Sequence, residues 1–120
     1  MGGKGAKQAP PNLERYERLV ATIPAVERKG VTLPYTSLNG HMFSFVAEDG
    51  SVVLRLGADD RSAFMERYGA GLHEAHGTVM RECVSVPDAL ADDTTSLAPW
   101  FEHSHTYVAA LKPKATRRAG

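Results

Sequence analysis

Two turn dipeptides, Asn39-Gly40 and Asp49-Gly50, interrupt a stretch of alternating apolar residues between positions 32 and 56. A two-residue hairpin loop needs positive φ at its central positions, and Asn-Gly and Asp-Gly adopt positive φ with little steric cost. The stretch therefore predicts a three-stranded antiparallel meander. Pro34 cannot donate a ladder hydrogen bond, so we expect the first strand at an edge of the sheet.

Two-residue loops would place Phe45 opposite Leu54 and Phe43 opposite Leu56. Because side chains alternate along a strand, this register predicts one apolar side that faces the core. The expected core side consists of Phe43, Phe45, Ala47, Val52, Leu54 and Leu56. The expected outer side carries Leu33, Tyr35, Ser37, Met42, Ser44, Val46, Glu48, Val53 and Arg55.

Three segments show helical spacing of apolar residues. The first runs from an Asn12 N-cap to Pro24, the second from Asp59 or Asp60 as N-cap to Gly69, and the third from Ser96 to Lys112-Pro113. Each has one apolar stripe, which predicts that the three helices pack on the sheet.

Between the second and third helices, residues 69–77 contain three glycines and predict a loop, and residues 79–86 predict a fourth strand. Strict alternation would place Glu82 on the apolar side of this strand, where an unpaired carboxylate is costly. We therefore expect a bulge near Arg81-Glu82 or a cation beside Glu82. Residues 87–95 read as an acidic turn.

The element order helix, three strands, helix, strand, helix predicts an α+β fold with two layers. Its antiparallel sheet would be the meander plus one or two further strands, with the three helices mainly on one face. A chain of 120 residues is long enough for one domain with its own core. We expect that domain at 12–112, between a disordered tail at 1–11 and a disordered basic tail at 113–120.

The charge balance bears on the partners of the chain. Lys plus Arg and Asp plus Glu both number 14, so the surface lacks the basic excess typical of nucleic-acid binding. Any such binding should be weak and should come from the basic tails. A single cysteine, Cys83, fits a reducing compartment, and no secretory or membrane-spanning segment is apparent, so we expect a cytoplasmic location.

The stretch PYTSLNGHMFSFVAEDGSVVLRL and the closing SLAPWFEHSHTYVAALKPK resemble the N-terminal domain family of the TfoX/Sxy competence regulators, from about Leu13 to Lys112. The matching features are the Asn-Gly turn, Met42-Phe43 at the start of the next strand, and Leu54-Arg55 at the end of the meander. The chain departs from the family in having Leu33-Pro34-Tyr35-Thr36 where the regulators typically have Met-Phe-Gly-Gly, and in lacking their helical C-terminal domain. The resemblance implies an α+β two-layer fold and a non-enzymatic interaction domain, with no catalytic residues to carry over.

Two groups on the expected outer side are candidate sites. Tyr35, Ser44 and Arg55 would form a row able to hold an anion or the carboxylate of a partner, since arginine offers a planar fork of donors. Cross-strand polar pairing on a wet face is the alternative for this row. The apolar residues Leu33, Met42, Val46 and Val53 would form the face of a homodimer, unless a helix of the same chain covers them.

Metal, nucleophile and base-stacking sites are not predicted. His103 and His105 would point about 200° apart on a helix, which excludes a shared metal ion. His73 and His76, with Glu74, are too few ligands for a zinc site, and Cys83 within a strand is typical of a packed thiol. The aromatic residues Trp100, Phe101 and Tyr107 could stack on bases, but their helical spacing favours the core. No cofactor is predicted.

The first functional hypothesis is a small cytoplasmic, non-enzymatic protein-interaction or regulatory domain of TfoX N-terminal type. The alternative is a small-ligand-binding domain or minor enzyme that uses the face of Tyr35, Ser44 and Arg55, and the third is a weak nucleic-acid binder. A concave polar pocket over Arg55 would favour a small ligand, whereas a flat or convex apolar surface would favour a protein partner.

Overall fold

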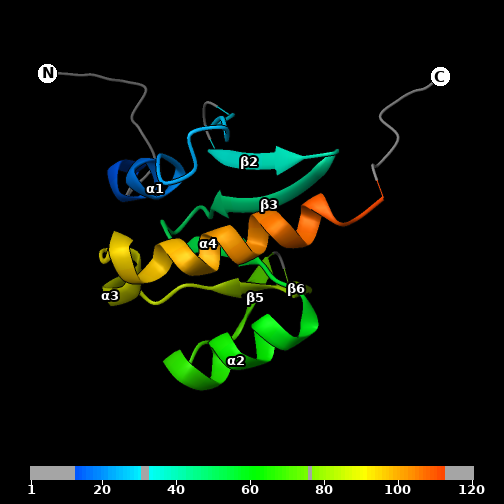
Figure 1. The fold of residues 1–120 in the computed structure, drawn as a ribbon. Helices are drawn as coiled ribbons and strands as arrows, with labels where there is room; N and C mark the ends of the chain where they lie inside the picture. The colour runs from blue at the N-terminus through cyan, green and yellow to red at the C-terminus, as the bar shows by residue number, and fades with distance from the viewer. Residues whose placement is uncertain (1–12, 31–32, 76, 113–120) are drawn as a thin grey trace, which may run out of the picture.

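A computed structural model of the chain describes residues 13–30, 33–75 and 77–112. These residues form an α+β fold with four helices and a five-stranded antiparallel sheet (Figure 1). Asn12, His76 and both tails lie outside the described residues. In chain order the elements are α1 Leu13–Val20, β2 Tyr35–Leu38, β3 His41–Val46, β4 Val52–Arg55, α2 Ala58–Tyr68, β5 Leu72–Ala75, β6 Thr78–Ser85, α3 Asp88–Ala91 and α4 Thr94–Ala109.

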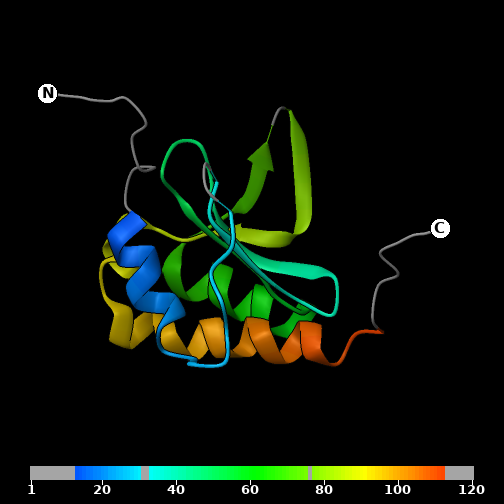
Figure 2. The same ribbon diagram turned by 90° about the horizontal axis from the view of Figure 1, so that it is seen from above.

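The elements form two layers. Figure 2 shows helices α1, α2 and α4 on one face of the sheet, while the β5–β6 hairpin rises from the sheet away from them. The strand order is β2-β3-β4-β6-β5, so β2 lies at an edge, as Pro34 predicts. The expected two-layer α+β fold is confirmed, with two strands added to the meander.

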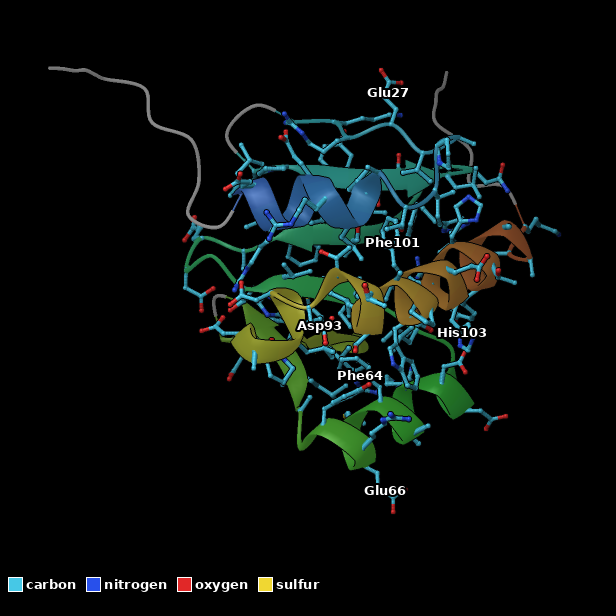
Figure 3. All side chains as sticks on the ribbon, turned by 60° about the vertical axis from the view of Figure 1, so that its left-hand side comes forward. Glu27, Phe64, Glu66, Asp93, Phe101 and His103 are labelled. Atoms are coloured by element: carbon cyan, nitrogen blue, oxygen red, sulfur yellow. The ribbon has the colours of Figure 1, made fainter. Side chains whose placement is uncertain are left out.

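The core fills the space between the helices and the inner face of the sheet. Its largest fully buried side chains include Tyr16, Phe43, Phe64 and Phe101. The rings of Phe43 on β3 and Phe101 on α4 are tilted, with their centroids 5.6 Å apart. Figure 3 shows Phe64 and Phe101 pointing into the interior. The aromatic residues of α2 and α4 therefore attach both helices to one continuous core.

The first predicted hairpin is confirmed. Asn39 and Gly40 occupy its turn with φ values of 57° and 81°. Beyond the turn, Ser37 lies opposite Met42 but Thr36 lies opposite Ser44, so Phe43 is an extra residue in β3. This β-bulge sends Phe43 and Ser44 to the same, inner side of the sheet.

The second hairpin has a three-residue loop in place of the expected two. The amide of Ala47 donates to the carbonyl of Ser51 at 2.8 Å, which leaves Glu48, Asp49 and Gly50 in the loop. Gly50 has φ 91°, the positive value that a glycine accepts at the end of such a loop. The longer loop shifts the pairing of β3 and β4 by one residue.

The predicted core side of β3 is consequently wrong at two positions. Phe45 lies opposite Val53 and is only half-buried, on the outer face, and Ala47 has left the strand. Ser44 and Val46 instead face the core and are almost fully buried. The predicted core positions of Phe43 and of Val52, Leu54 and Leu56 are confirmed.

Several element boundaries also differ from the expected ones. Helix α1 ends at Val20, before Pro24, and α2 has Gly57 as N-cap without a side-chain hydrogen bond, so an aspartate cap is wrong there. Gly69, with φ 64°, ends α2 as predicted. The acidic segment contains the short helix α3, and the side chain of Asp93 caps α4. The predicted loop 69–77 contains β5.

A buried arginine ties three distant segments together. The guanidinium of Arg15 on α1 lies 2.9 Å from the carboxylate of Asp88 and 3.0 Å from that of Asp92, and it also donates to the carbonyl of Gly50. Only 6% of its side chain is exposed, whereas both carboxylates are largely in solvent. Arg15 thus joins α1 to α3 and to the β3–β4 loop.

Replacing Gly40 tests the first turn. In Gly40→Val a β-branched residue would have to adopt positive φ, which we expect to lower the free energy of unfolding by about 1 to 2 kcal/mol. The matched control is Gly71→Val, because Gly71 is exposed, lacks positive φ and has no atom within 4 Å of an added Cβ. Urea denaturation measures both, and equal stabilities would contradict the assigned turn.

A pair of alanine variants tests the bulge. Phe43→Ala should cost about 3 to 5 kcal/mol, because it leaves a cavity in the core. Phe45→Ala should cost only about 1 to 2 kcal/mol, because the ring is half-exposed on the outer face. Both values come from urea denaturation. A larger loss of unfolding free energy in Phe45→Ala than in Phe43→Ala would favour the register with two-residue loops.

Candidate functional site

The outer face of the sheet is the side away from the helices, and the β5–β6 hairpin bends over it (Figure 2). The ring of Phe45 on β3 lies edge-on to that of His73 on β5, with centroids 5.5 Å apart. Two strands separate β3 from β5 in the sheet, so the contact requires the hairpin to curl over the face. Val53 is fully buried on this side, beneath that contact.

The larger hollow on the outer face lies over Arg55, and we call it the Arg55 groove. Its volume is about 510 Å³, within the range typical of ligand sites. One wall comes from the β2–β3 turn and β3, the other from β6. Its lining residues are Gly40, His41, Met42, Phe43, Phe45, Arg55, Met80, Arg81, Glu82 and Cys83.

An ion pair holds one end of the Arg55 groove. Arg55 donates to Glu82 at 2.7 Å through Nε, and its second guanidinium nitrogen lies 2.7 Å from the same oxygen. The Tyr107 hydroxyl of α4 donates to the other carboxylate oxygen at 3.1 Å. The Tyr107 ring also lies 5.7 Å from the guanidinium carbon of Arg55. Glu82 therefore has both a strand bend and a cation, the two alternatives that the sequence left open.

The bend in β6 is visible in its pairing with β5. Leu72 pairs with Val84, and the next residue, His73, pairs with Met80. Three residues of β6, 81–83, therefore have no pairing partner in β5. Glu82 is among them, and its carbonyl accepts from the amide of Leu56 at 2.9 Å. The bend turns the Glu82 side chain toward Arg55 and α4.

The electrostatics of the groove follow from these contacts. Burial disfavours the charged form of Glu82, but hydrogen bonds from Arg55 and Tyr107 and the positive charges of Arg55 and Arg61 outweigh it, so the pKa of Glu82 lies below its ordinary value. Burial raises the pKa of the Cys83 thiol. The cysteine is therefore held as a protonated thiol, the unreactive form.

A second hollow of about 300 Å³ lies on the other side of Phe45. His73 forms part of it, is 8% exposed, and makes a 3.1 Å hydrogen bond between its Nδ1 and the hydroxyl of Ser85. We call this the His73 hollow. Its lining residues are Leu33, Phe45, Val46, Ala47, Glu48, Asp49, His73, Glu74 and Ala75.

The predicted row of Tyr35, Ser44 and Arg55 is wrong in its geometry. Ser44 faces the core, where its hydroxyl is 2.7 Å from that of Tyr16 and hydrogen-bonds Thr36. Tyr35 pairs with Phe45 at the edge strand, and Arg55 lies opposite Cys83. The bulge at Phe43 separates Ser44 from Tyr35, and the three-residue loop between β3 and β4 separates it from Arg55. Of the predicted row, only Arg55 lines the groove.

The predicted dimer face is divided in the same way. Leu33 and Met42 are exposed, at 45% and 41%, but Val46 belongs to the core and Val53 is fully buried under the β5–β6 hairpin. The two alternatives for this face, a homodimer or a covering helix of the same chain, are both incomplete, because the β5–β6 hairpin covers part of it. A homodimer through Leu33 and Met42 stays a prediction.

The remaining candidates have structural partners. His103 pairs with Asp60 at 3.3 Å, whereas the ring of His105 lies edge-on to Phe43, so the two histidines have different neighbours. No group of three potential metal ligands occurs among the residues described by the structure. Phe101 is buried, and Trp100 donates to the Tyr68 hydroxyl at 3.2 Å.

Sequence reasoning missed two residues that line the Arg55 groove, Met80 and Arg81. They belong to the first half of β6, which turns away from the core beyond the bend at Glu82. The available signal was Gly77 as a turn residue directly before the β-prone run that begins at Thr78, whereas residues 72–75 are not rich in strand formers. Gly77 has φ 79° in the structure, as a tight turn requires.

Comparison of the chain with protein-family models, with curated proteins and with solved structures finds no match. Among the described residues, no helix has the length and apolar character needed to cross a bilayer.

Removing the Arg55 guanidinium tests the electrostatics of the groove. Arg55→Met should raise the pKa of Glu82, and Tyr107→Phe should raise it less, because each removes a hydrogen bond to the carboxylate. Carbon NMR of the carboxyl group measures this pKa, with the exposed Arg18→Met as control.

The sign of the stability effect follows from the lowered pKa. Glu82 stabilises the fold above the ordinary carboxyl pKa, and this contribution is lost as the pH falls through its lowered folded-state value. Arg55→Met should remove this part of the pH dependence. An unchanged Glu82 titration in Arg55→Met would contradict the assigned pair.

Proposed function

We propose that this chain is a small, non-enzymatic protein-interaction domain of TfoX N-terminal type that binds a partner on the outer face of its sheet. A cytoplasmic location is part of the proposal and rests on the single cysteine. The family assignment rests on the sequence features of the meander and the closing helix.

One observation carries the proposal: the exposed large apolar side chains of the described residues all belong to strands or to the approach to β2. They are Leu33 at 45%, Met42 at 41%, Leu72 at 38% and Val79 at 48% exposure. The inner face, by contrast, is closed by α1, α2 and α4. Of these four, Leu33 lines the His73 hollow and Met42 lines the Arg55 groove. Exposed apolar side chains that border a hollow are typical of a binding surface.

The contacts of the polar groups favour binding over catalysis. Arg55 and Glu82 satisfy one another, and Cys83 is a buried thiol with a raised pKa. A cysteine nucleophile needs a lowered thiol pKa or an adjacent base. The raised pKa of the Cys83 thiol is the opposite of the first requirement. These groups are suited to holding the shape of a groove.

A small-ligand-binding domain is the second candidate, favoured by the concave shape of the Arg55 groove. Its lining mixes charged groups with methionine and phenylalanine, so it satisfies only part of the criterion of a polar pocket. A homodimer would use the same face. Nucleic-acid binding would depend on the tails, which lie outside the described residues.

Site-specific photo-crosslinking tests the proposed binding face. A photoreactive amino acid at Met42 should give a covalent adduct in native cells, whereas the same group at Glu66 should give much less. Glu66 is exposed on α2 and points away from the domain (Figure 3). An adduct of twice the chain mass would identify a second copy as the partner. Equal yields at both positions, or none at Met42, would overturn the proposed face.

A further inference from the structure

The charges around the Arg55 groove are unbalanced. Arg55 is neutralised by Glu82, but Arg81 is exposed and has no ion-pair partner in the described part of the chain. Arg61 donates to the carbonyl of Leu56 and lies close enough to act on the charge of Glu82. Two arginines, Arg55 and Arg81, thus line the groove with one carboxylate, that of Glu82. The unbalanced positive charge favours an anionic occupant.

The apolar lining of the same groove favours an apolar side chain beside that anion. Met42 on β3 and Met80 on β6 stand on opposite walls, and the ring of Phe45 on β3 also lines the groove. Methionine is flexible and polarisable, which suits it to accepting side chains of varied shape, as at peptide-binding surfaces. The walls are strand segments open to solvent, so an extended segment can enter from the side.

We propose that the Arg55 groove binds an extended peptide segment in which an apolar residue precedes an acidic one, the apolar side chain lying between Met42 and Met80 and the carboxylate beside Arg81. This inference rests on the proposed function and specifies the chemistry of the partner. Arg55 holds the groove through Glu82, while Arg81 remains available to the incoming carboxylate.

Peptides with a single changed residue test the inference. The probe is acetyl-Gly-Leu-Leu-Glu-Gly-amide, compared with the same peptide carrying Gln or Lys in place of Glu. Titration into the isotope-labelled full chain should shift the backbone NMR signals of Met42, Phe45, Met80 and Cys83. The Glu peptide should bind about two- to fivefold more tightly than the Gln peptide, the gain expected of one exposed ion pair.

A matched pair of variants locates the charge. Arg81→Ser should remove the preference for Glu over Gln, while Arg18→Ser, an exposed arginine on α1, should leave it unchanged. Added salt should reduce the same preference, because it screens an exposed pair. Two variants that behave alike would show that general charge, and not Arg81, attracts the peptide.

Other outcomes would overturn the inference about the peptide without contradicting the proposed function. Equal binding of the Glu and Gln peptides, no binding, or shifts confined to other surfaces would end it. Hexanoate shifting the same signals as strongly as the Glu peptide would replace the peptide with a small organic anion. If Met42 still crosslinks a protein partner in those cases, the interaction domain stands and only the stated peptide chemistry fails.

Discussion

The single extra residue in β3, together with the three-residue loop that follows this strand, decides which side chains face the core and which face outward. Without the bulge, strict alternation would place Phe43 and Phe45 on the same side. With it, Phe43 packs on Phe101 in the core while Phe45 meets His73 on the outer face. The β3 wall of the Arg55 groove follows from the bulge, and the burial of Ser44 opposite Leu54 follows from the longer loop.

Turning Ser44 inward places a hydroxyl in an apolar core, where it must find partners. Tyr16 of α1 and Thr36 of β2 supply them, and burial raises the pKa of the Tyr16 phenol to about 12 in spite of these hydrogen bonds. On α4, the Ser104 hydroxyl lies within hydrogen-bonding reach of the Phe43 and Arg55 carbonyls, and its single proton can satisfy one at a time. The irregular ladder is thus stabilised from two helices.

The positions of the two turns, the core side of β4 and the helical stripes could be predicted because each depends on local residue types or on a simple period. The bulge could not be predicted, because nothing in the sequence around Phe43 distinguishes a strand with one extra residue from a regular strand. The loop at Asp49-Gly50 was misjudged because the same dipeptide also suits a three-residue loop. The candidate row containing Ser44 failed for these reasons, while Arg55, on the correctly assigned β4, was found.

Glu82 shows how a local conflict in the sequence becomes part of the Arg55 groove. An unpaired carboxylate on the apolar side of a strand is costly. In this structure the strand bends at Glu82, and Arg55 forms an ion pair with it. The bend directs the first half of β6, with Met80 and Arg81, away from the helices and makes it the second wall of the groove. Because Glu82 already forms an ion pair with Arg55, the positive charge available to the proposed partner is that of Arg81. The ion pair of Arg55 and Glu82 therefore also determines that Arg81 is the cation open to the proposed ligand.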